Sequence, residues 1–204
     1  MRFIYVLSVI LWATLCDAVA NIGFNDPTCL CPTQFDDDHC RDKSFPVLGG
    51  VDFVQYFTDF KLPDGTYNES KIGLVGSAEF QAQFNEFTFY FLSQKNLDMF
   101  NACPTCYIPQ YGGFCTWGVT GEFCPKYAWS ADCLGPAGSW NMWTVYDGKL
   151  YFFLHEDPKS KFLQDPATYV VAGDARWYQW FGDQYQSVFD TKCYKTENHY
   201  KPTA

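Results

Sequence analysis

Four residues have the types and spacing that could carry chemistry: Cys103, Cys106, Cys115 and His155. Cys103-Pro104-Thr105-Cys106 is a C-x-x-C motif, whose two sulfurs can bind one metal ion, act as a redox dithiol or serve as structural disulfides. Redox motifs of this kind open a helix, and Tyr107-Ile108-Pro109 cannot easily continue one because proline lacks a backbone N–H. Structural disulfides are therefore the default interpretation, and metal binding is the main alternative.

Cys115 and His155 are the other two candidate metal ligands. His155 precedes Glu156 and Asp157, a cluster that could hold a divalent ion or supply a base, although a solvated loop at the start of a helix explains it as well. Thiolate and imidazole together would suit zinc or copper(I). An enzymatic alternative would use Cys115 as a nucleophile, but the sequence has no serine nucleophile elbow, phosphate loop or dinucleotide fingerprint.

The start of the chain predicts export. Residues 1–20 combine Arg2, an apolar run from Phe3 to Leu15 and the small residues Ala18-Val19-Ala20, as in a removable signal peptide. The apolar run is shorter than the roughly 20 residues that a membrane-spanning helix needs. We therefore expect a secreted, extracellular protein without a membrane span.

The cysteine count agrees with an oxidising compartment. Of ten cysteines, Cys16 lies in the predicted signal peptide and nine remain. Most should pair, and the odd number leaves at least one as a thiol, bound to a ligand or joined to another chain, which permits a disulfide-linked dimer. Cys115, Cys124 and Cys133 are nine residues apart, a spacing that favours structural disulfides over ligands. The sequon Asn68-Glu69-Ser70 predicts a glycoprotein, with chance occurrence as the alternative.

Charge and composition narrow the partners. The chain has 14 basic and 23 acidic residues, so a phosphate backbone would be repelled and we expect no nucleic-acid partner and no membrane-surface role. It is aromatic-rich, with 20 Phe, 14 Tyr and 7 Trp. We expect most of these rings in the core and some on a surface that meets a partner.

Two β-hairpins are predicted. Phe80, Ala82 and Phe84 alternate with polar residues before Asn85-Glu86, and phenylalanine occupies every second position over 87–91. This alternation places one phenylalanine-lined face toward the core. In the second hairpin, Asp147-Gly148 separates 143–146 from 150–153 and fits a two-residue type I′ turn.

Helices should follow the hairpins. Ser93 suits the N-cap of a short helix, and Asp157-Pro158 and Asp165-Pro166 each place a capping acid before a proline. We expect an α+β domain over 49–182, preceded by a cysteine-rich arm at 21–48 and followed by a polar tail at 183–204.

The stretch from Val51 to Trp177 resembles the YHS-domain family, in particular its exported single-domain members. The matching segments are VDFVQYF, GSAEFQAQFNEFTFYFLS, NLDMF, YIPQYGGFC, WTVYDGKLYFF and FLQDPATYVVAGDARW. The resemblance implies a small α+β domain and a link to metal handling. Relatives carry metal-binding cysteines at two places where this sequence has Gln55 and Leu92, so the family's usual thiolate pair is missing.

Two functions follow as expectations. The first is metal binding or metal handling without catalysis, with zinc or copper held by Cys103, Cys106, Cys115 and His155. The second is a disulfide-stabilised extracellular interaction module that binds protein or glycan through an aromatic surface.

Overall fold

The computed structural model describes residues 40–120, 129–135, 138–182, 188–194 and 196. The predicted signal peptide, Cys29, Cys31, Cys124 and the last residues of the tail lie outside this part of the chain. The elements in chain order are η2 (Val47–Gly50), α3 (Phe53–Phe57), β1 (Ser77–Phe84), β2 (Phe87–Phe91), α4 (Gln94–Ala102), α5 (Pro104–Tyr107), η3 (Gln110–Gly113), α6 (Thr116–Thr120), β3 (Trp143–Tyr146), β4 (Lys149–Phe152), α7 (Glu156–Phe162) and α8 (Pro166–Phe181).

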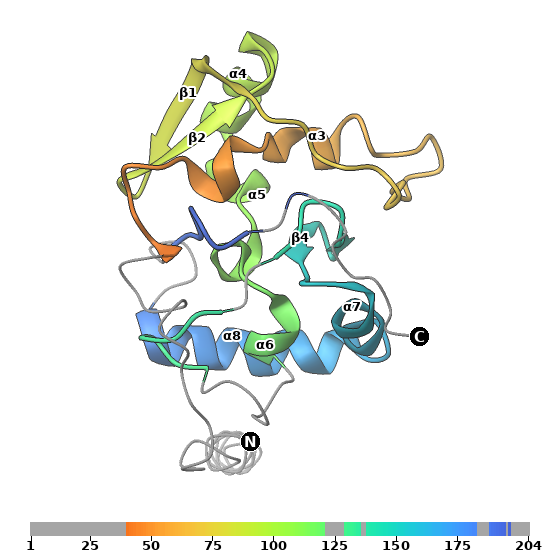
Figure 1. Ribbon diagram of the computed structural model, residues 1–204. Helices are drawn as coiled ribbons and strands as arrows, with labels where there is room; N and C mark the ends of the chain where they lie inside the picture. The colour runs from red at the N-terminus through yellow and green to blue at the C-terminus, as the bar shows by residue number, and fades with distance from the viewer. Residues whose placement is uncertain (1–39, 121–128, 136–137, 183–187, 195, 197–204) are drawn as a thin grey trace, which may run out of the picture.

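The fold class is α+β, as expected, with two separate antiparallel sheets of two strands each. The β1–β2 hairpin lies at one end of the molecule and α8 crosses the other end, with β4 and α5 between them (Figure 1). No helix in the described ranges is both long enough and apolar enough to cross a membrane.

Both predicted hairpins are confirmed. In the first, Phe84 pairs with Phe87, and Asn85 and Glu86 both have positive φ, at 50° and 69°. In the second, Tyr146 pairs with Lys149 around Asp147 and Gly148, which also have positive φ. Positive φ at both turn positions is what a two-residue type I′ hairpin requires.

Two of the three predicted helix starts are confirmed. The Ser93 side chain accepts a hydrogen bond from the N–H of Asn96 at the start of α4, and Asp165 accepts one from Thr168 at the start of α8. The third prediction is wrong, because His155 is the N-cap of α7 and Asp157 lies inside its first turn. Pro158 is tolerated there since the first N–H groups of a helix have no partner within it.

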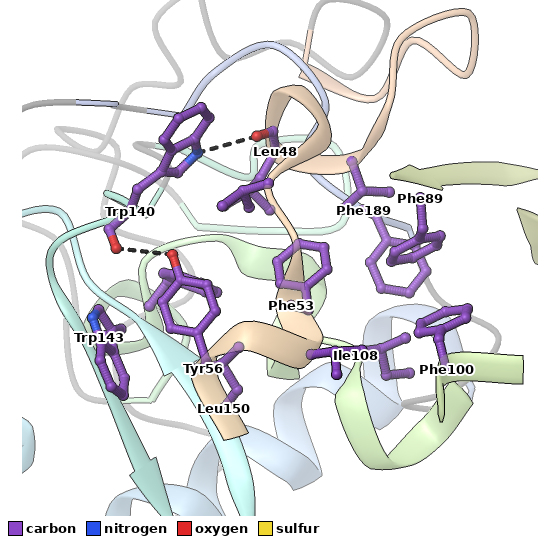
Figure 2. Packing of buried hydrophobic residues seen from close by; sticks show 14 of the residues in the cluster. Leu48, Phe53, Tyr56, Phe89, Phe100, Ile108, Trp140, Trp143, Leu150 and Phe189 are labelled. Carbon is purple, nitrogen blue, oxygen red and sulfur yellow. Dashed lines mark hydrogen bonds between the residues drawn. The ribbon is translucent and has the colours of Figure 1, made fainter. Parts of the chain in front are cut away.

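The larger core cluster joins the first hairpin to the second. Phe53 and Tyr56 of α3 lie in the middle of this cluster. Phe89 of β2 and Phe100 of α4 lie on one side of them, and Trp143 of β3 lies on the other (Figure 2). The Tyr56 hydroxyl donates to the carbonyl of Trp140 at 2.9 Å, and the Trp140 indole N–H donates to the carbonyl of Leu48 at 3.1 Å. These two bonds satisfy polar groups that aromatic packing would otherwise leave buried without a partner.

Phe189, Asp190 and Thr191 are buried, whereas the sequence analysis assigned them to a polar tail. Phe189 is fully buried, with its ring centroid 5.3 Å from that of Phe89. The N–H of Asp190 donates to the carbonyl of Gly112 at 2.8 Å. A Cβ on Gly112 would lie 2.2 Å from the carbonyl oxygen of Val188, so this close approach requires glycine. The Cys40–Cys193 disulfide joins the segment to the chain that precedes η2.

Candidate functional site

Cys103 and Cys106 are joined to each other in a disulfide. Pro104–Tyr107 forms the single turn α5, with Cys103 as its N-cap residue, and the helix does not continue past Tyr107, as the Tyr107-Ile108-Pro109 sequence predicts. Pro104 suits the first helical position, and the turn stops before Pro109, which sets its short length. Cys103 is half-buried and Cys106 is exposed.

The backbone holds this disulfide independently of its sulfur atoms. The N–H of Cys103 donates to the carbonyls of Met99 and Phe100, and the N–H of Ile108 donates to that of Pro104. The Tyr107 ring meets that of Phe57 edge-on, with centroids 5.5 Å apart.

Cys115 lies in the second core cluster, at the start of α6. It is a thiol, 3% exposed. Its segment pairs with β4 in a parallel bridge at Phe152, and its sulfur accepts a hydrogen bond from the N–H of Leu154 at 3.4 Å. His155 is the next residue along the chain, half-buried at the N-cap of α7. The structure therefore places the backbone of Leu154, the residue before His155, beside the Cys115 sulfur.

The four predicted ligands do not converge on one site. Two are oxidised to a disulfide beside α3 and α4, and disulfide sulfurs are not thiolates. Within the described residues, no three His, Cys, Asp or Glu side chains gather where they could hold a metal ion. The four-donor geometry of a structural zinc site is therefore not met by the predicted set of Cys103, Cys106, Cys115 and His155.

The acidic residues after His155 belong to the helix start. Asp157 pairs with Lys161 at 2.8 Å, and Glu156 accepts a hydrogen bond from the hydroxyl of Ser160 at 3.0 Å. Both contacts run between residues i and i+4 of α7. This agrees with the interpretation of the cluster as a solvated first turn, where acidic side chains are favoured by the helix dipole.

The exposed face of α8 is a feature that the sequence analysis did not single out. Every residue of α8 is described, and the exposed ones are Ala167, Thr168, Val171, Ala175, Tyr178 and Gln179, none of them charged. At about 100° per residue they fall within one sector of about 120°. Val171 is 70% exposed and Tyr178 is 67% exposed. We call these six residues the α8 face.

Of the two charged residues of α8, Arg176 lies on the opposite side of the helix, whereas Asp174 is half-buried and borders this face. Arg176 is buried and donates a hydrogen bond to the carbonyl of Val119 in α6, and burial lowers the pKa of its guanidinium to about 10. Asp174 accepts a hydrogen bond from the Tyr111 hydroxyl at 2.8 Å, and burial raises the pKa of that hydroxyl. Gly173 lies against Tyr111 and Thr120, where a Cβ would fall 2.6 Å from the Tyr111 hydroxyl oxygen. The helix therefore directs Arg176 and its closest packing inward, and the one carboxylate that borders the exposed face accepts a hydrogen bond from Tyr111.

Plotting residues 166–181 on a helical wheel reveals this face from the sequence. Trp177, Trp180 and Phe181 mark the packed side in the sequence, and the positions opposite them would ordinarily be charged on a surface helix. Their neutrality is visible in the sequence once the bounds of the helix are known.

Comparison with protein-family models, with curated proteins and with solved structures finds no match to this chain. The resemblance to the YHS-domain family stays a prediction.

Proposed function

We propose that this chain is an extracellular interaction module that binds a second copy of itself through the α8 face. The observation that carries this proposal is the neutral, exposed surface of a 16-residue helix, with Val171 and Tyr178 more than half exposed. Surface helices of globular proteins ordinarily carry charged and polar residues on the side away from the core.

Charge favours a second copy as the partner. The chain has a formal net charge of −9, so most surfaces of two copies repel each other. In a two-fold dimer the same patch meets itself, and like charges would then oppose each other unless the patch is neutral. The α8 face meets that condition, and the small residues Ala167 and Ala175 allow two helices to approach closely.

Sedimentation equilibrium of the secreted, disulfide-intact chain tests the proposal. We expect a reversible dimer whose dissociation constant rises at least ~10-fold with Val171→Glu or Tyr178→Glu, because the two-fold axis places two new carboxylates in the interface. Leu74→Glu is the matched control, since Leu74 is an apolar side chain, 57% exposed, in the loop before β1.

A wild-type chain that stays monomeric at all concentrations would contradict the proposal. So would an equal effect of Leu74→Glu. Non-reducing electrophoresis separates this association from a disulfide-linked dimer.

The second candidate function is binding of a soft metal ion at Cys115 and His155. It is supported by the hydrogen bond from the N–H of Leu154 to the Cys115 sulfur, which joins this thiol to the backbone one residue before His155. Thiolate and imidazole are ligands that suit zinc or copper(I).

Elemental analysis of the gently desalted protein tests this candidate. We expect about one metal ion per chain, lost in both Cys115→Ser and His155→Gln and retained in the control His199→Gln. A folded wild-type protein without metal, or metal that both substitutions leave in place, would rule this candidate out.

A further inference from the structure

Two kinds of disulfide occur in the described part of the chain. Cys40–Cys193 joins residues 153 apart in the sequence, and Cys40 is 1% exposed. Cys103–Cys106 joins residues three apart, and Cys106 is exposed to solvent. A thiolate can reach an exposed disulfide sulfur directly, and exposed disulfides are the more easily reduced ones.

The fold depends little on Cys103–Cys106. The stabilisation that a disulfide gives by restricting the unfolded chain grows with the length of the loop it closes, so this shortest loop contributes least. The hydrogen bonds of the Cys103 and Ile108 N–H groups, and the contact between Phe57 and Tyr107, do not involve the sulfur atoms. After reduction the two thiols stay on the same turn, positioned to rejoin.

From this geometry we propose that Cys103 and Cys106 form a redox-active pair that exchanges disulfides with extracellular peptide dithiols. Cys106 carries the sulfur that the substrate attacks, because Cys106 is the more exposed of the two residues. Cys103 is the leaving group, and the Thr105 hydroxyl oxygen lies 3.9 Å from its sulfur, close enough to donate to the thiolate that forms.

The exchange balances without another reactant. One thiolate of the peptide bonds to the Cys106 sulfur, the Cys103–Cys106 bond breaks, and its electron pair leaves on Cys103, which takes up a proton. The second peptide thiolate then attacks the peptide sulfur of this mixed disulfide and releases Cys106 as a thiolate. The peptide dithiol is oxidised to a disulfide, and the protein disulfide is reduced by the same two electrons.

The first test equilibrates the full secreted protein in buffers of reduced and oxidised glutathione, followed by alkylation and mass mapping. We expect Cys103 and Cys106 to open at a value of [GSH]²/[GSSG] at least ~100-fold lower than the value that opens Cys40–Cys193. Circular dichroism should show an unchanged fold when the pair is open. If both disulfides open together, or opening the pair unfolds the chain, the proposal is wrong.

The second test asks which sulfur reacts. With a synthetic two-cysteine peptide, Cys103→Ser should trap at least ~10-fold more mixed disulfide at Cys106 than Cys106→Ser traps at Cys103. Equal trapping by the two variants would overturn the assignment of Cys106. Neither test depends on association through the α8 face.

Discussion

Asp52→Ala is expected to lower the free energy of unfolding by at least about 3 kcal/mol. Asp52 is fully buried, and its two carboxylate oxygens join three parts of the fold. One oxygen caps α3 by accepting from the N–H of Val54 at 2.9 Å. The other accepts from the N–H of Leu92 at 2.8 Å and from the side-chain amide of Asn96 at 2.7 Å. Alanine leaves all three donors, two of them buried and that of Leu92 partly buried, without this acceptor.

Urea unfolding at neutral pH measures this loss. Asp64→Ala is the control, since Asp64 accepts from the N–H and hydroxyl of Thr66 in a similar local turn, but in an exposed loop. Water can replace Asp64 there, so its removal should change stability little. Comparable losses for the two variants would mean that the link from α3 to β2 and α4 contributes nothing beyond the local turn.

Asp190→Asn is expected to stabilise the protein at pH 8 by more than about 2 kcal/mol and to change its stability little at pH 4. Burial raises the pKa of Asp190 to about 8, against the smaller effect of hydrogen bonds to one oxygen from the N–H groups of Cys193 and Lys192. The other oxygen is buried with no hydrogen-bond partner within the described part of the chain. Asparagine resembles the protonated carboxyl group and carries no charge.

The sign of the pH effect follows from proton binding. The pKa of an aspartate in the unfolded chain is about 4, whereas the pKa of Asp190 in the folded protein is about 8. Between these values the folded state binds more protons than the unfolded state, so stability falls as pH rises through that window. Urea unfolding at several pH values should show a fall that Asp190→Asn removes.

Asp42→Asn is the control of opposite sign. Hydrogen bonds from Ser44 and Lys192 lower the pKa of Asp42 to about 2, so its contribution to stability is lost as pH falls. A wild-type protein whose stability rises steadily from pH 4 to pH 8, with Asp190→Asn running parallel to it, would show that Asp190 is ionised in the folded state.

Local structure could be predicted from the sequence because its causes are local. Asp147-Gly148 specifies a type I′ turn between apolar strands, and Ser93 and Asp165 cap helices whose first turns lie within three residues of them. The predicted start of α7 lies two residues after the observed one, because the Asp157-Pro158 pair resembles a helix start. A proline also fits the third position of a first turn, which is where Pro158 lies.

Long-range placement could not be predicted. Nothing near Phe189 in the sequence indicates that its ring packs against Phe87, about a hundred residues earlier, or that Gly112 makes room for that segment. The contacts of Asp52 with Leu92 and Asn96 are of the same kind.

The candidate site was predicted only in part for a related reason. The spacing of Cys103 and Cys106 allows a metal site, a redox pair or a structural disulfide, and the structure shows them bonded to each other. The contact of the Cys115 sulfur with the backbone of Leu154, next to His155, depends on the pairing of the Cys115 segment with β4, which no local pattern encodes.

Hydroxyl-radical footprinting of the wild-type protein over a range of concentrations tests association through the α8 face most directly. Tyr178 is 67% exposed in the single chain, and Leu74 is 57% exposed. The account predicts that oxidation of Tyr178 falls several-fold as the concentration passes the dissociation constant, while oxidation of Leu74 stays constant. Oxidation of Tyr178 that does not change with concentration would contradict it.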